Sequence, residues 1–472
     1  MSEPAIAKTT VLRALPSVDQ LLRTEAAMEL RQRIGASRLT SLARSVTDEM
    51  RVEIQSRELS GPVTREALLD LSVQRLKDAC RRAERSGIRR VINATGVILH
   101  TNLGRAPLSE AARNAIAGAS GYCTLEYDPA TGSRGRRGAR VEALLIELTG
   151  AEDALVVNNC AAAAFLILSV LAKDGETLVS RGELVEIGGD FRVPDVMANS
   201  GTRMIEVGTT NRTRLDDYRR AITPHTRVLM RVHQSNYRIV GFTTSPTLSE
   251  LALLTREAKL ILFEDAGSGA LFDLEEQGLG DEPVIKDSIA HGADVVSFSG
   301  DKLLGAPQAG LIVGKREIVD RLRKHSLYRA LRVDKLTLAA LEGTLEAYSR
   351  GVALNDVPAL RMLALPPAEI DQRAHNLVQS ISEKLGDSPL TVGLLKGESA
   401  VGGGSGPNTH PETTLISIQH NRFPADEIQA RLRSSSPPVI ARIADGKVLL
   451  DLRTVDLTEE SELTEAVCRL VN

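Results

Sequence analysis

The sequence predicts an α/β protein with a helical N-terminal domain, a large domain built on a mostly parallel sheet, and a small C-terminal α/β domain. The length of 472 residues exceeds what one hydrophobic core usually supports. From residue 87 to about residue 330, short apolar runs alternate with helical patterns, which is typical of strands buried beneath helices in a parallel sheet. Before this region, apolar residues recur at three- and four-residue steps, which predicts helices.

The helical N-terminal domain is expected at residues 1–86. Helical spacing over residues 17–60 is interrupted by a Ser-Gly-Pro break at residues 60–62, and a further helix begins at Thr64. That helix ends in an arginine-rich stretch before Gly87, which is where we expect the first domain boundary.

The large domain is expected at residues 87–345. Its predicted strands are short, mostly apolar runs at residues 154–157, 227–230, 260–263, 294–298 and 310–313. In a parallel sheet of this kind the functional residues lie at the carboxyl ends of the strands. Several unusual residues of this sequence follow these runs directly.

The small α/β domain is expected at residues 346–472. A Leu-Pro-Pro segment at residues 365–367 predicts a hinge, and apolar runs near residues 414–419 and 448–452 predict strands. The glycine-rich residues 402–406 predict a flexible loop without chemistry of its own.

The composition is that of an ordinary globular protein. Hydrophobic residues make up 42% of the chain and charged residues 25%, and no apolar run is long enough to span a bilayer. The four cysteines form no Cys-X-X-Cys pair, so we expect neither a zinc site nor a disulfide framework. The N-terminus has no signal-peptide layout, and because the cysteines suggest no disulfide framework, a reducing cytoplasm is the expected location.

The N-terminal segment is more basic than the rest of the chain. Residues 1–90 hold 17 basic against 12 acidic side chains, while the whole chain has a net charge of −3. A basic segment suits contact with a phosphate backbone, although a solvated helical surface explains the charge equally well.

A lysine lies in a turn of small residues directly after one predicted strand. A structural role for Lys302 is disfavoured, because a buried ammonium without a partner is costly. An amine in an enclosed site is suited to form an imine with an aldehyde cofactor. The hydroxyls of Ser297 and Ser299 are candidate donors to a cofactor phosphate. The alternative is an ordinary surface lysine in a loop.

An acidic residue follows the strand predicted at residues 260–263. Asp265 is expected to pair with a pyridinium nitrogen, because an acid there keeps the ring protonated and able to accept electrons. Glu264 carries the same charge, but an Asp-Ala step after an apolar strand favours Asp265. The alternative for a single aspartate is a helix N-cap.

A phosphate-binding turn is predicted between another strand and an alanine-rich helix. Asn159, Cys160 and Ala161 open this helix, and the free N–H groups at a helix N-terminus can hold a phosphate. A tightly packed helix uses the same alanines, so this pattern is weak by itself. In order and spacing, the phosphate turn, Asp265 and Lys302 together predict a pyridoxal-phosphate enzyme of fold type I, with the cofactor bound through Lys302.

Longer stretches across the large domain match the pattern of one known family: residues 90–96, 100–105, 125–128, 207–213, 233–237 and 298–310. In these stretches the chain resembles the bacterial L-seryl-tRNA(Sec) selenium transferases, also called selenocysteine synthases. Ala306 stands where the family pattern has glycine, which leaves the assignment of Lys302 intact. The resemblance implies conversion of seryl-tRNA(Sec) to selenocysteinyl-tRNA(Sec) with pyridoxal phosphate and selenophosphate. The serine hydroxyl leaves by β-elimination, and selenium adds to a dehydroalanyl intermediate.

The resemblance also implies roles for charged residues. Lys302 acts as general base at the substrate α-carbon, and Asp301 orients the lysine or assists loss of the hydroxyl. Arg105, Arg329 and Arg332 form the anion site for the selenium donor, because planar guanidinium groups suit an oxyanion. The spacing predicts that Arg329 and Arg332 share one helix face; without the resemblance, two solvated arginines are the simpler interpretation.

Other candidates lie further from the predicted lysine turn. Thr209, Thr210 and Tyr237 are candidate substrate contacts, and His233 is a candidate to lie near the cofactor ring. A histidine at a strand end is more often a hydrogen-bonded structural residue. The arginine- and glycine-rich residues 131–140 fit a tRNA contact, a subunit contact or a solvated loop.

The resemblance implies two kinds of partner. One is tRNA(Sec) charged with serine, bound by the basic residues 1–86. The other is a second copy of the chain, because sites of this fold are generally built from two subunits. The family forms a ring of five dimers, which nothing in the residues themselves requires.

Three other functions remain as alternatives. A pyridoxal-phosphate lyase acting on a small amino acid or amino sugar acid shares the core chemistry but has no need of a basic helical domain. A cysteine desulfurase requires a mobile nucleophilic cysteine, for which Cys80 and Cys160 are poorly placed. A catalytically inert tRNA-binding protein is disfavoured, because the predicted lysine, aspartate and serine of the cofactor site are all present.

Overall fold

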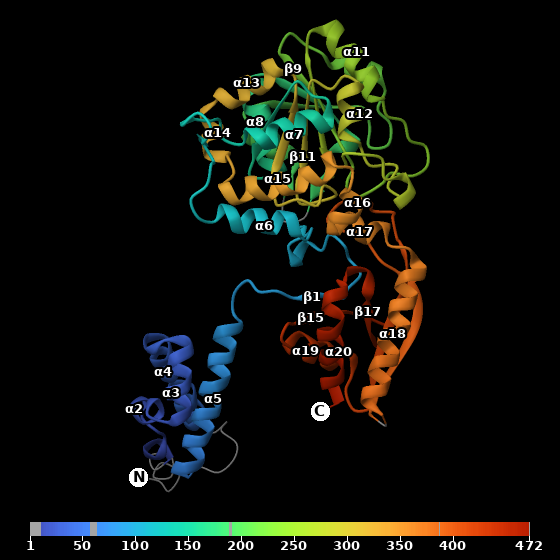
Figure 1. Ribbon diagram of the computed structural model, residues 1–472. Helices are drawn as coiled ribbons and strands as arrows, with labels where there is room; N and C mark the ends of the chain where they lie inside the picture. Colours follow the sequence, from blue (N-terminus) through green and yellow to red (C-terminus); the bar gives the residue numbers. More distant parts are fainter. Residues whose placement is uncertain (1–10, 57–63, 188–190, 387, 472) are drawn as a thin grey trace. The chain divides into compact units, whose positions relative to one another are not determined.

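The computed structural model describes residues 11–56, 64–187, 191–386 and 388–471 (Figure 1). The chain divides into two compact units, residues 1–90 and residues 91–472. The Ser-Gly-Pro break expected at residues 60–62 lies outside the described residues. Among the described residues, none of the helices combines the length and the apolar composition that a bilayer-spanning segment requires.

The first unit consists of helices packed around an apolar core. Its helices are α2 (Val18–Leu22), α3 (Glu25–Ile34), α4 (Ala36–Ser56) and α5 (Arg65–Arg85). Ser17, Thr24 and Thr64 begin three of them, because each hydroxyl accepts a hydrogen bond from a backbone N–H of the first turn. Apolar residues at helical spacing, among them Leu39 and Leu76, are buried against one another. The helices predicted in this region are confirmed.

Within the described part of the second unit, seven strands form one mixed sheet. They are β4 (Asp153–Val157), β5 (Glu176–Ser180), β8 (Arg203–Val207), β9 (Thr226–Val232), β10 (Ile261–Gly267), β11 (Val295–Ser299) and β12 (Gly310–Gly314). Their order is β4-β12-β11-β10-β9-β5-β8, and all except β12 run in the same direction. The predicted strands are confirmed as β4, β9, β10, β11 and β12.

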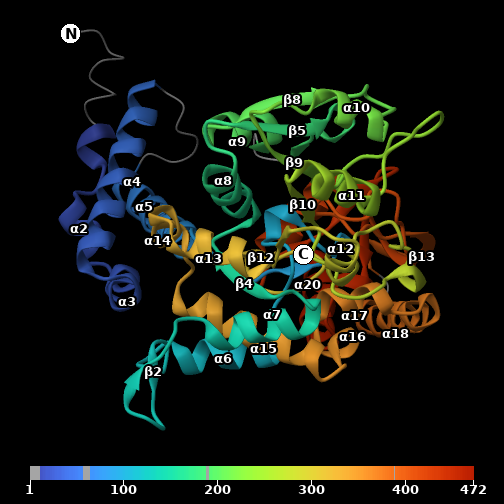
Figure 2. The same ribbon diagram turned by 90° about the horizontal axis from the view of Figure 1, so that it is seen from above.

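Helices cover both faces of this sheet (Figure 1 and Figure 2). The main covering helices are α7 (Ala139–Thr149) and α15 (Lys335–Ser349) on one face, and α8 (Cys160–Leu171) and α13 (Arg316–Lys324) on the other. Val156 and Leu311 enter the first core, whereas their neighbours Leu155 and Ile312 enter the second. Burial on both faces explains why these strands are continuous apolar runs.

Further helices complete this part of the unit: α6 (Glu110–Ala119), α9 (Val193–Asn199), α10 (Leu215–Ala221), α11 (Leu248–Ala258), α12 (Ile285–Ala290), α14 (Ser326–Leu331), α16 (Ala353–Asp356) and α17 (Pro358–Ala364). Near the N-terminal side of the unit, β1 (Ile92–Asn93) pairs in parallel with β15 (Val439–Ile440). The start of the unit is therefore held against its C-terminal part.

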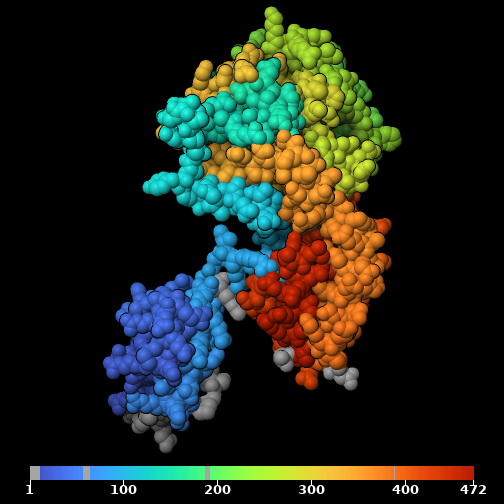
Figure 3. All heavy atoms as spheres, in the orientation of Figure 1, coloured from blue at the N-terminus to red at the C-terminus, as the bar shows by residue number. Residues whose placement is uncertain are grey.

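The C-terminal part of the second unit has its own antiparallel sheet. Its strands are β13 (Leu390–Glu398), β14 (Glu412–His420), β17 (Lys447–Asp451) and β16 (Arg442–Ala444), and its helices are α18 (Pro367–Leu385), α19 (Ala425–Ser434) and α20 (Glu460–Cys468). Figure 3 shows α18 in orange beside the red C-terminal residues on the surface. β14 and β17 confirm the two strands predicted here.

A buried arginine joins this sheet to the end of α17. Arg453 is 1% exposed. Its Nη1 donates to the carbonyl oxygens of Met362 and Leu365 at 2.8 and 2.9 Å. Its Nη2 donates to the carbonyl of Glu412 at 2.7 Å, and its Nε donates to the hydroxyl of Ser399 at 3.0 Å. Because residues 365–367 are the predicted hinge, this arginine holds the main chain where that hinge begins.

Candidate active site

Strand register brings the three predicted features to one edge of the large sheet. Between β10 and β11, Asp265 pairs with Ser297. Between β11 and β12, Ser299 pairs with Gly310, and Gly310 pairs in turn with Val157 at the end of β4. The lysine turn, the aspartate and the start of α8 therefore meet, as expected at the carboxyl ends of strands in such a sheet.

Lys302 is buried at this edge. It is 4% exposed, and within the described residues its amine has neither a hydrogen-bond partner nor an ion-pair partner. The Nζ atom lies 3.9 Å from the point where a Cβ of Gly267 would stand, and 3.9 Å from the corresponding point of Gly404. Two glycines from distant parts of the chain thus leave room beside the amine.

Asp265 is near enough for the charge of this amine to act on it, and it accepts two hydrogen bonds on one oxygen. Its Oδ1 accepts from the hydroxyl of Ser297 at 3.0 Å and from the thiol of Cys160 at 3.2 Å. Its Oδ2 has no partner in the described residues and is available to a ligand. Burial raises the pKa of Asp265, while the hydrogen bonds from Cys160 and Ser297 and the charge of Lys302 act in the opposite direction.

Glu264 occupies the opposite face of β10, because successive strand residues point to opposite sides. Its Oε2 has no partner among the described residues, and burial raises its pKa. Asp265, and not Glu264, is therefore the carboxylate that shares the face of the sheet with Cys160.

The thiol of Cys160 is a protonated donor to Asp265, because burial raises the pKa of the thiol, as does the nearby carboxylate. We expect Cys160→Ala to raise the pKa of Asp265 further, because the variant loses a hydrogen bond that stabilises the ionised carboxylate. Since the ring nitrogen needs the ionised carboxylate, the variant should lose activity on acidification at a higher pH than the wild type does. The pH profile of turnover measures this shift.

Cys160→Ser is the matched control, because a hydroxyl still donates at this position. Its acidic limb is expected to stay near that of the wild type. An unchanged acidic limb in Cys160→Ala contradicts the role of the thiol.

The start of α8 offers donors for an anion. Asn159 caps the helix by accepting from the N–H of Ala162 at 2.8 Å. The N–H groups of Cys160 and Ala161 have no partner within the described residues, and neither does the buried hydroxyl of Ser299. Helix N–H groups and a hydroxyl together fit a phosphate. Of the two serines expected to donate to a phosphate, Ser297 donates to the aspartate instead.

Gly310 lets β12 pass close to this helix start. A Cβ there would lie 2.0 Å from the carbonyl oxygen of Asn159. We expect Gly310→Ala to lower the free energy of unfolding by about 1–3 kcal/mol, because overpacking displaces the turn. Pyridoxal phosphate should bind more weakly for the same reason. Urea unfolding of the apoprotein and cofactor titration measure the two effects.

Gly118→Ala in α6 is the control for this substitution. A Cβ there meets nothing within 4 Å, so stability is expected to stay equal or to rise slightly. Equal unfolding midpoints for Gly310→Ala and the wild type would show that the start of α8 can shift to accept the added Cβ without loss of stability.

Arg105 and Asp301 form an ion pair beside the lysine turn. Nη1 of Arg105 lies 2.8 Å from Oδ2 of Asp301, and the two side chains are 26% and 9% exposed. Arg105 has a φ of 62°, a strained conformation for a residue other than glycine. Its Nε has no partner in the described residues, so one donor remains for a ligand.

His233 follows β9, and a buried carboxylate holds its ring. Its Nε2 lies 3.0 Å from Oε2 of Glu282, and its backbone N–H donates to the carbonyl of Asp265 at 3.0 Å. Glu282 also accepts from the N–H of Gly406 at 2.8 Å. Sequence reasoning missed Glu282, which ties the glycine-rich residues 402–406 to the site.

The predicted substrate contacts lie further apart. The hydroxyl of Tyr237 donates to the carbonyl of Gly182 after β5. Thr209 and Thr210 are exposed and follow β8, the edge strand four positions from β11. The hydroxyl of Thr209 donates to the carbonyl of Arg212 at 2.9 Å. The structure therefore does not bring either threonine next to the lysine turn.

The two arginines beyond the lysine lie at α14. Arg329 is exposed on the helix, which ends at Leu331, so Arg332 is its C-terminal cap. The N–H of Arg332 still donates to the carbonyl of Tyr328 at 2.9 Å. The carbonyl of Leu331 accepts from the N–H of Asn158 at 2.9 Å, which places the end of α14 next to the start of α8.

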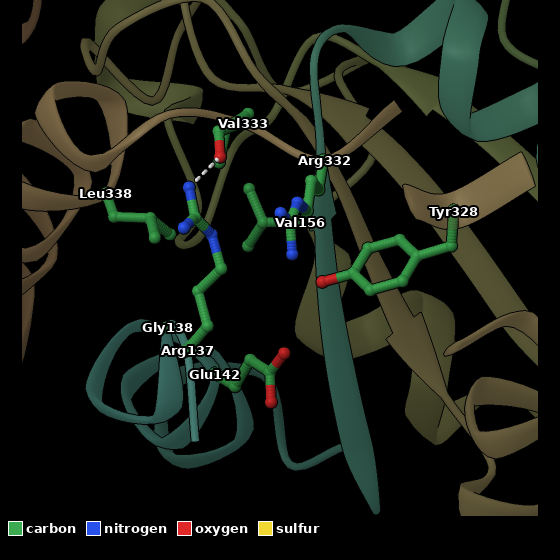
Figure 4. A pocket seen from close by; sticks show the side chains of 8 residues that line it. All are labelled: Arg137, Gly138, Glu142, Val156, Tyr328, Arg332, Val333 and Leu338. Atoms are coloured by element: carbon green, nitrogen blue, oxygen red, sulfur yellow. Dashed lines mark hydrogen bonds between the residues drawn. The ribbon is translucent and has the colours of Figure 1, made fainter. Parts of the chain in front are cut away.

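Arg332 points into a pocket between β4, α7 and α14 (Figure 4). The lining residues are Arg137, Gly138, Glu142, Val156, Tyr328, Arg332, Val333 and Leu338. Arg137 donates to the carbonyl of Val333 at 2.7 Å, and its Nε has no partner among the described residues. Burial raises the pKa of Glu142 to about 7, although nearby arginines oppose the shift. Arg329 does not line this pocket.

The arginine-rich residues 131–140 include part of a short hairpin, formed by β2 (Tyr127–Asp128) and β3 (Ser133–Arg134). Four of its arginines form ion pairs within the chain: Arg134 and Arg137 with Glu126, Arg136 with Glu142, and Arg140 with Glu346. Three of these arginines are exposed, whereas Glu142 is buried and the other two carboxylates are partly buried.

The groups gathered at the sheet edge match the parts of pyridoxal phosphate. The amine of Lys302 suits its aldehyde, the free oxygen of Asp265 suits its ring nitrogen, and the start of α8 suits its phosphate. Among the described residues, no cluster of three or more histidine, cysteine, aspartate or glutamate side chains is arranged to hold a metal ion.

A solved structure shares this architecture. The structure of a D-glucosaminate-6-phosphate ammonia-lyase matches with a TM-score of 0.55 and 20% identity, covering 83% of this chain and 98% of that chain. The fold of the chain is therefore that of the fold-type I class of pyridoxal-phosphate enzymes, with a helical N-terminal segment.

Sequence comparison specifies the family. A family model described as L-seryl-tRNA selenium transferase matches residues 91–456, and one described as selenocysteine synthase N terminal matches residues 12–51. The L-seryl-tRNA(Sec) selenium transferase of Moorella thermoacetica is 48% identical over 459 residues, covering 97% of this chain and 96% of that protein. That of Carboxydothermus hydrogenoformans is 45% identical over 452 residues, 95% of each. The chain belongs to the L-seryl-tRNA selenium transferase family, which confirms the resemblance.

Proposed function

We propose that this chain converts L-seryl-tRNA(Sec) to selenocysteinyl-tRNA(Sec), with pyridoxal phosphate as cofactor and selenophosphate as selenium donor. The observation that carries the proposal is the buried amine of Lys302, which has no partner in the described residues and lies near Asp265. A buried amine of this kind is unfavourable unless it has a chemical function. Family membership supports the choice of substrate and makes a lyase for small amino acids the weaker alternative.

The proposed cofactor-binding residues are Lys302, Asp265, Asn159, Cys160, Ala161, Ser299 and His233. Asp265 holds the ring nitrogen in its protonated form, and the N–H groups that open α8 bind the phosphate together with Ser299. His233 contributes a ring that Glu282 keeps in one orientation. When bound, pyridoxal phosphate supplies an electron sink for the α-carbon of the seryl group.

Lys302 moves the proton. Its amine takes the proton from the α-carbon of the seryl group, and its burial keeps water from competing for that position. Asp301 stays next to the lysine through its ion pair with Arg105. It orients the lysine or assists departure of the serine hydroxyl.

The anionic selenium donor requires positive charge at the site. We assign this role to Arg105, whose Nε is free of partners in the described residues, and to Arg329 and Arg332. Thr209, Thr210 and Tyr237 are proposed contacts of the larger, tRNA-linked part of the substrate.

The direct test is conversion of seryl-tRNA(Sec) with selenophosphate by the purified protein. Formation of selenocysteinyl-tRNA(Sec), with no conversion of an ordinary seryl-tRNA, is the expected result. A cofactor-loaded protein that releases product from free serine or an amino sugar acid, and leaves the charged tRNA unchanged, would establish the lyase alternative.

Deletion of residues 1–86 separates tRNA binding from chemistry. We expect affinity for tRNA(Sec) to fall by about 10³-fold or more, because the basic helical unit supplies the phosphate contacts. Cofactor binding should persist, since the proposed cofactor residues lie in residues 91–472. Filter binding and absorbance titration measure the two properties. Equal tRNA affinity in both proteins assigns recognition to the second unit.

The proposal includes two further expectations. The protein acts in the cytoplasm, where charged tRNA is available, and it assembles as a homo-oligomer of at least two subunits, with the decamer as the expected form. Sedimentation measures the assembly.

A further inference from the structure

The glycine-rich residues 402–406 form a packed wall of the candidate site. Three consecutive glycines adopt left-handed conformations: Gly402 (φ 77°), Gly403 (φ 64°) and Gly404 (φ 75°). A Cβ on the first would lie 2.6 Å from Cγ1 of Val97, and one on the second 2.8 Å from Cβ of Leu99. Only glycines allow this segment to lie so close to the chain that leads into the site.

Gly404 opens a small space beside the lysine. The point where its Cβ would stand lies 3.8 Å from Oγ of Ser235 and 3.9 Å from Nζ of Lys302. Ser235 is 1% exposed, and its hydroxyl has no hydrogen-bond partner within the described residues. A buried hydroxyl and the amine therefore border the same space.

More donors without partners belong to this segment. Ser405 is 2% exposed, and its hydroxyl also lacks a partner in the described residues. The N–H groups of Gly403 and Gly404 also lack an acceptor in the described residues, whereas those of Ser405 and Gly406 donate hydrogen bonds. Buried donors are rarely left unpaired, so two such hydroxyls here indicate a ligand.

These donors are electrically neutral. Arg238, three residues after Ser235, donates to the carbonyls of Gln234 and Tyr237 and lies 3.9 Å from Glu282. Once the amine of Lys302 is engaged in the proposed reaction, a carboxylate here would be buried without a cation, which is strongly unfavourable. A neutral carbonyl oxygen needs only hydrogen-bond donors.

We propose that Ser235, Ser405 and the N–H groups of Gly403 and Gly404 bind the two oxygens of the ester group of an aminoacyl substrate. The site thereby selects a neutral aminoacyl ester over a free amino acid. This inference rests on the proposed function, because a seryl-tRNA is such an ester.

The test compares two small ligands on the full-length protein loaded with pyridoxal phosphate. L-serine methyl ester and L-serine are titrated while the cofactor absorbance is followed, and we expect half-saturation by the ester at a concentration at least about tenfold lower. Ser235→Ala and Ser405→Ala should each raise the half-saturating ester concentration about fivefold, as for loss of one neutral hydrogen bond. The value for L-serine should not change.

Ser200→Ala is the matched control. Ser200 is buried, and its hydroxyl donates to the carbonyl of Met197 in the preceding helix α9, so neither ligand should be affected. Equal half-saturation by the two ligands in the wild type, or an equal loss for both in the variants, overturns the inference and indicates a carboxylate site. Each half-saturating concentration is expressed as unprotonated amine, because the amine of the ester has the lower pKa; on that scale the wild-type comparison decides even where a variant does not fold.

Conversion of seryl-tRNA(Sec) by the wild type tests the proposed function separately. Ester selectivity without conversion refutes that function and leaves the ester site standing. Conversion without ester selectivity, or without any effect of the two serine variants, refutes the ester site alone.

Discussion

Replacing Lys302 by alanine is expected to slow conversion of seryl-tRNA(Sec) by at least about 10³-fold, since a positioned general base alone contributes about 10²–10⁴-fold. The visible absorption band of the bound cofactor should disappear. The apoprotein should remain as stable as the wild type or become more stable, because this buried amine has no partner in the described residues. Single-turnover kinetics, absorbance and thermal unfolding of the apoprotein measure the three effects.

Lys324→Ala serves as the control, because this lysine is exposed near the end of α13. None of the three measurements should change. A Lys302→Ala protein that keeps a visible band, loses it on borohydride treatment and then retains the reduced cofactor covalently would show that another amine holds the cofactor. A large loss of stability would show that the amine is a structural partner.

Arg453→Met is expected to lower the free energy of unfolding by about 3–5 kcal/mol, as for removal of one partner from a buried charged network. Its removal leaves the carbonyls of Met362, Leu365 and Glu412 without their donor. Asp451, which is 0% exposed, also loses the positive charge beside it. Urea unfolding of the apoprotein measures the change, and Arg453→Lys, which restores the charge but not the planar fork, should recover part of it.

Arg469→Met is the surface control for this substitution. Its partner Glu465 is one helical turn away, and the two side chains are 66% and 58% exposed. The change should stay within about 0.5 kcal/mol. If both variants unfold at the same urea concentration, the buried hydrogen bonds of Arg453 make no net contribution to the free energy of unfolding.

The central strands of the large sheet could be predicted because both of their faces are buried. The resulting apolar runs are visible in the sequence at β4, β10 and β11. β5 and β8 were not predicted, since polar and charged residues such as Glu176 and Arg203 interrupt their pattern. The reversed direction of β12 is likewise invisible in its sequence, because an apolar run carries no sign of strand direction.

The residues of the candidate site likewise fall into those that the local sequence pattern predicts and those that it does not. Lys302, Asp265 and Asn159 each follow a predicted strand, so local pattern and chemistry together single them out. Glu282 and Ser235 could not be found in this way, because their importance comes from tertiary packing against the glycine-rich residues 402–406. The consecutive glycines beside a serine were the available signal for that segment.

The strand reversal at β12 limits how the reactive amine can travel. The turn between β11 and β12 is closed by hydrogen bonds from Gly300 to Ala309 and from Ala306 to Gly300, at 2.9 and 2.8 Å. A further bond of 3.0 Å joins the N–H of Leu303 to the carbonyl of Ser268. With the backbone pinned on both sides, Lys302 swings by torsion about its own methylene bonds alone. Because the Cα of Lys302 stays in place, its amine returns to the same position after each turnover.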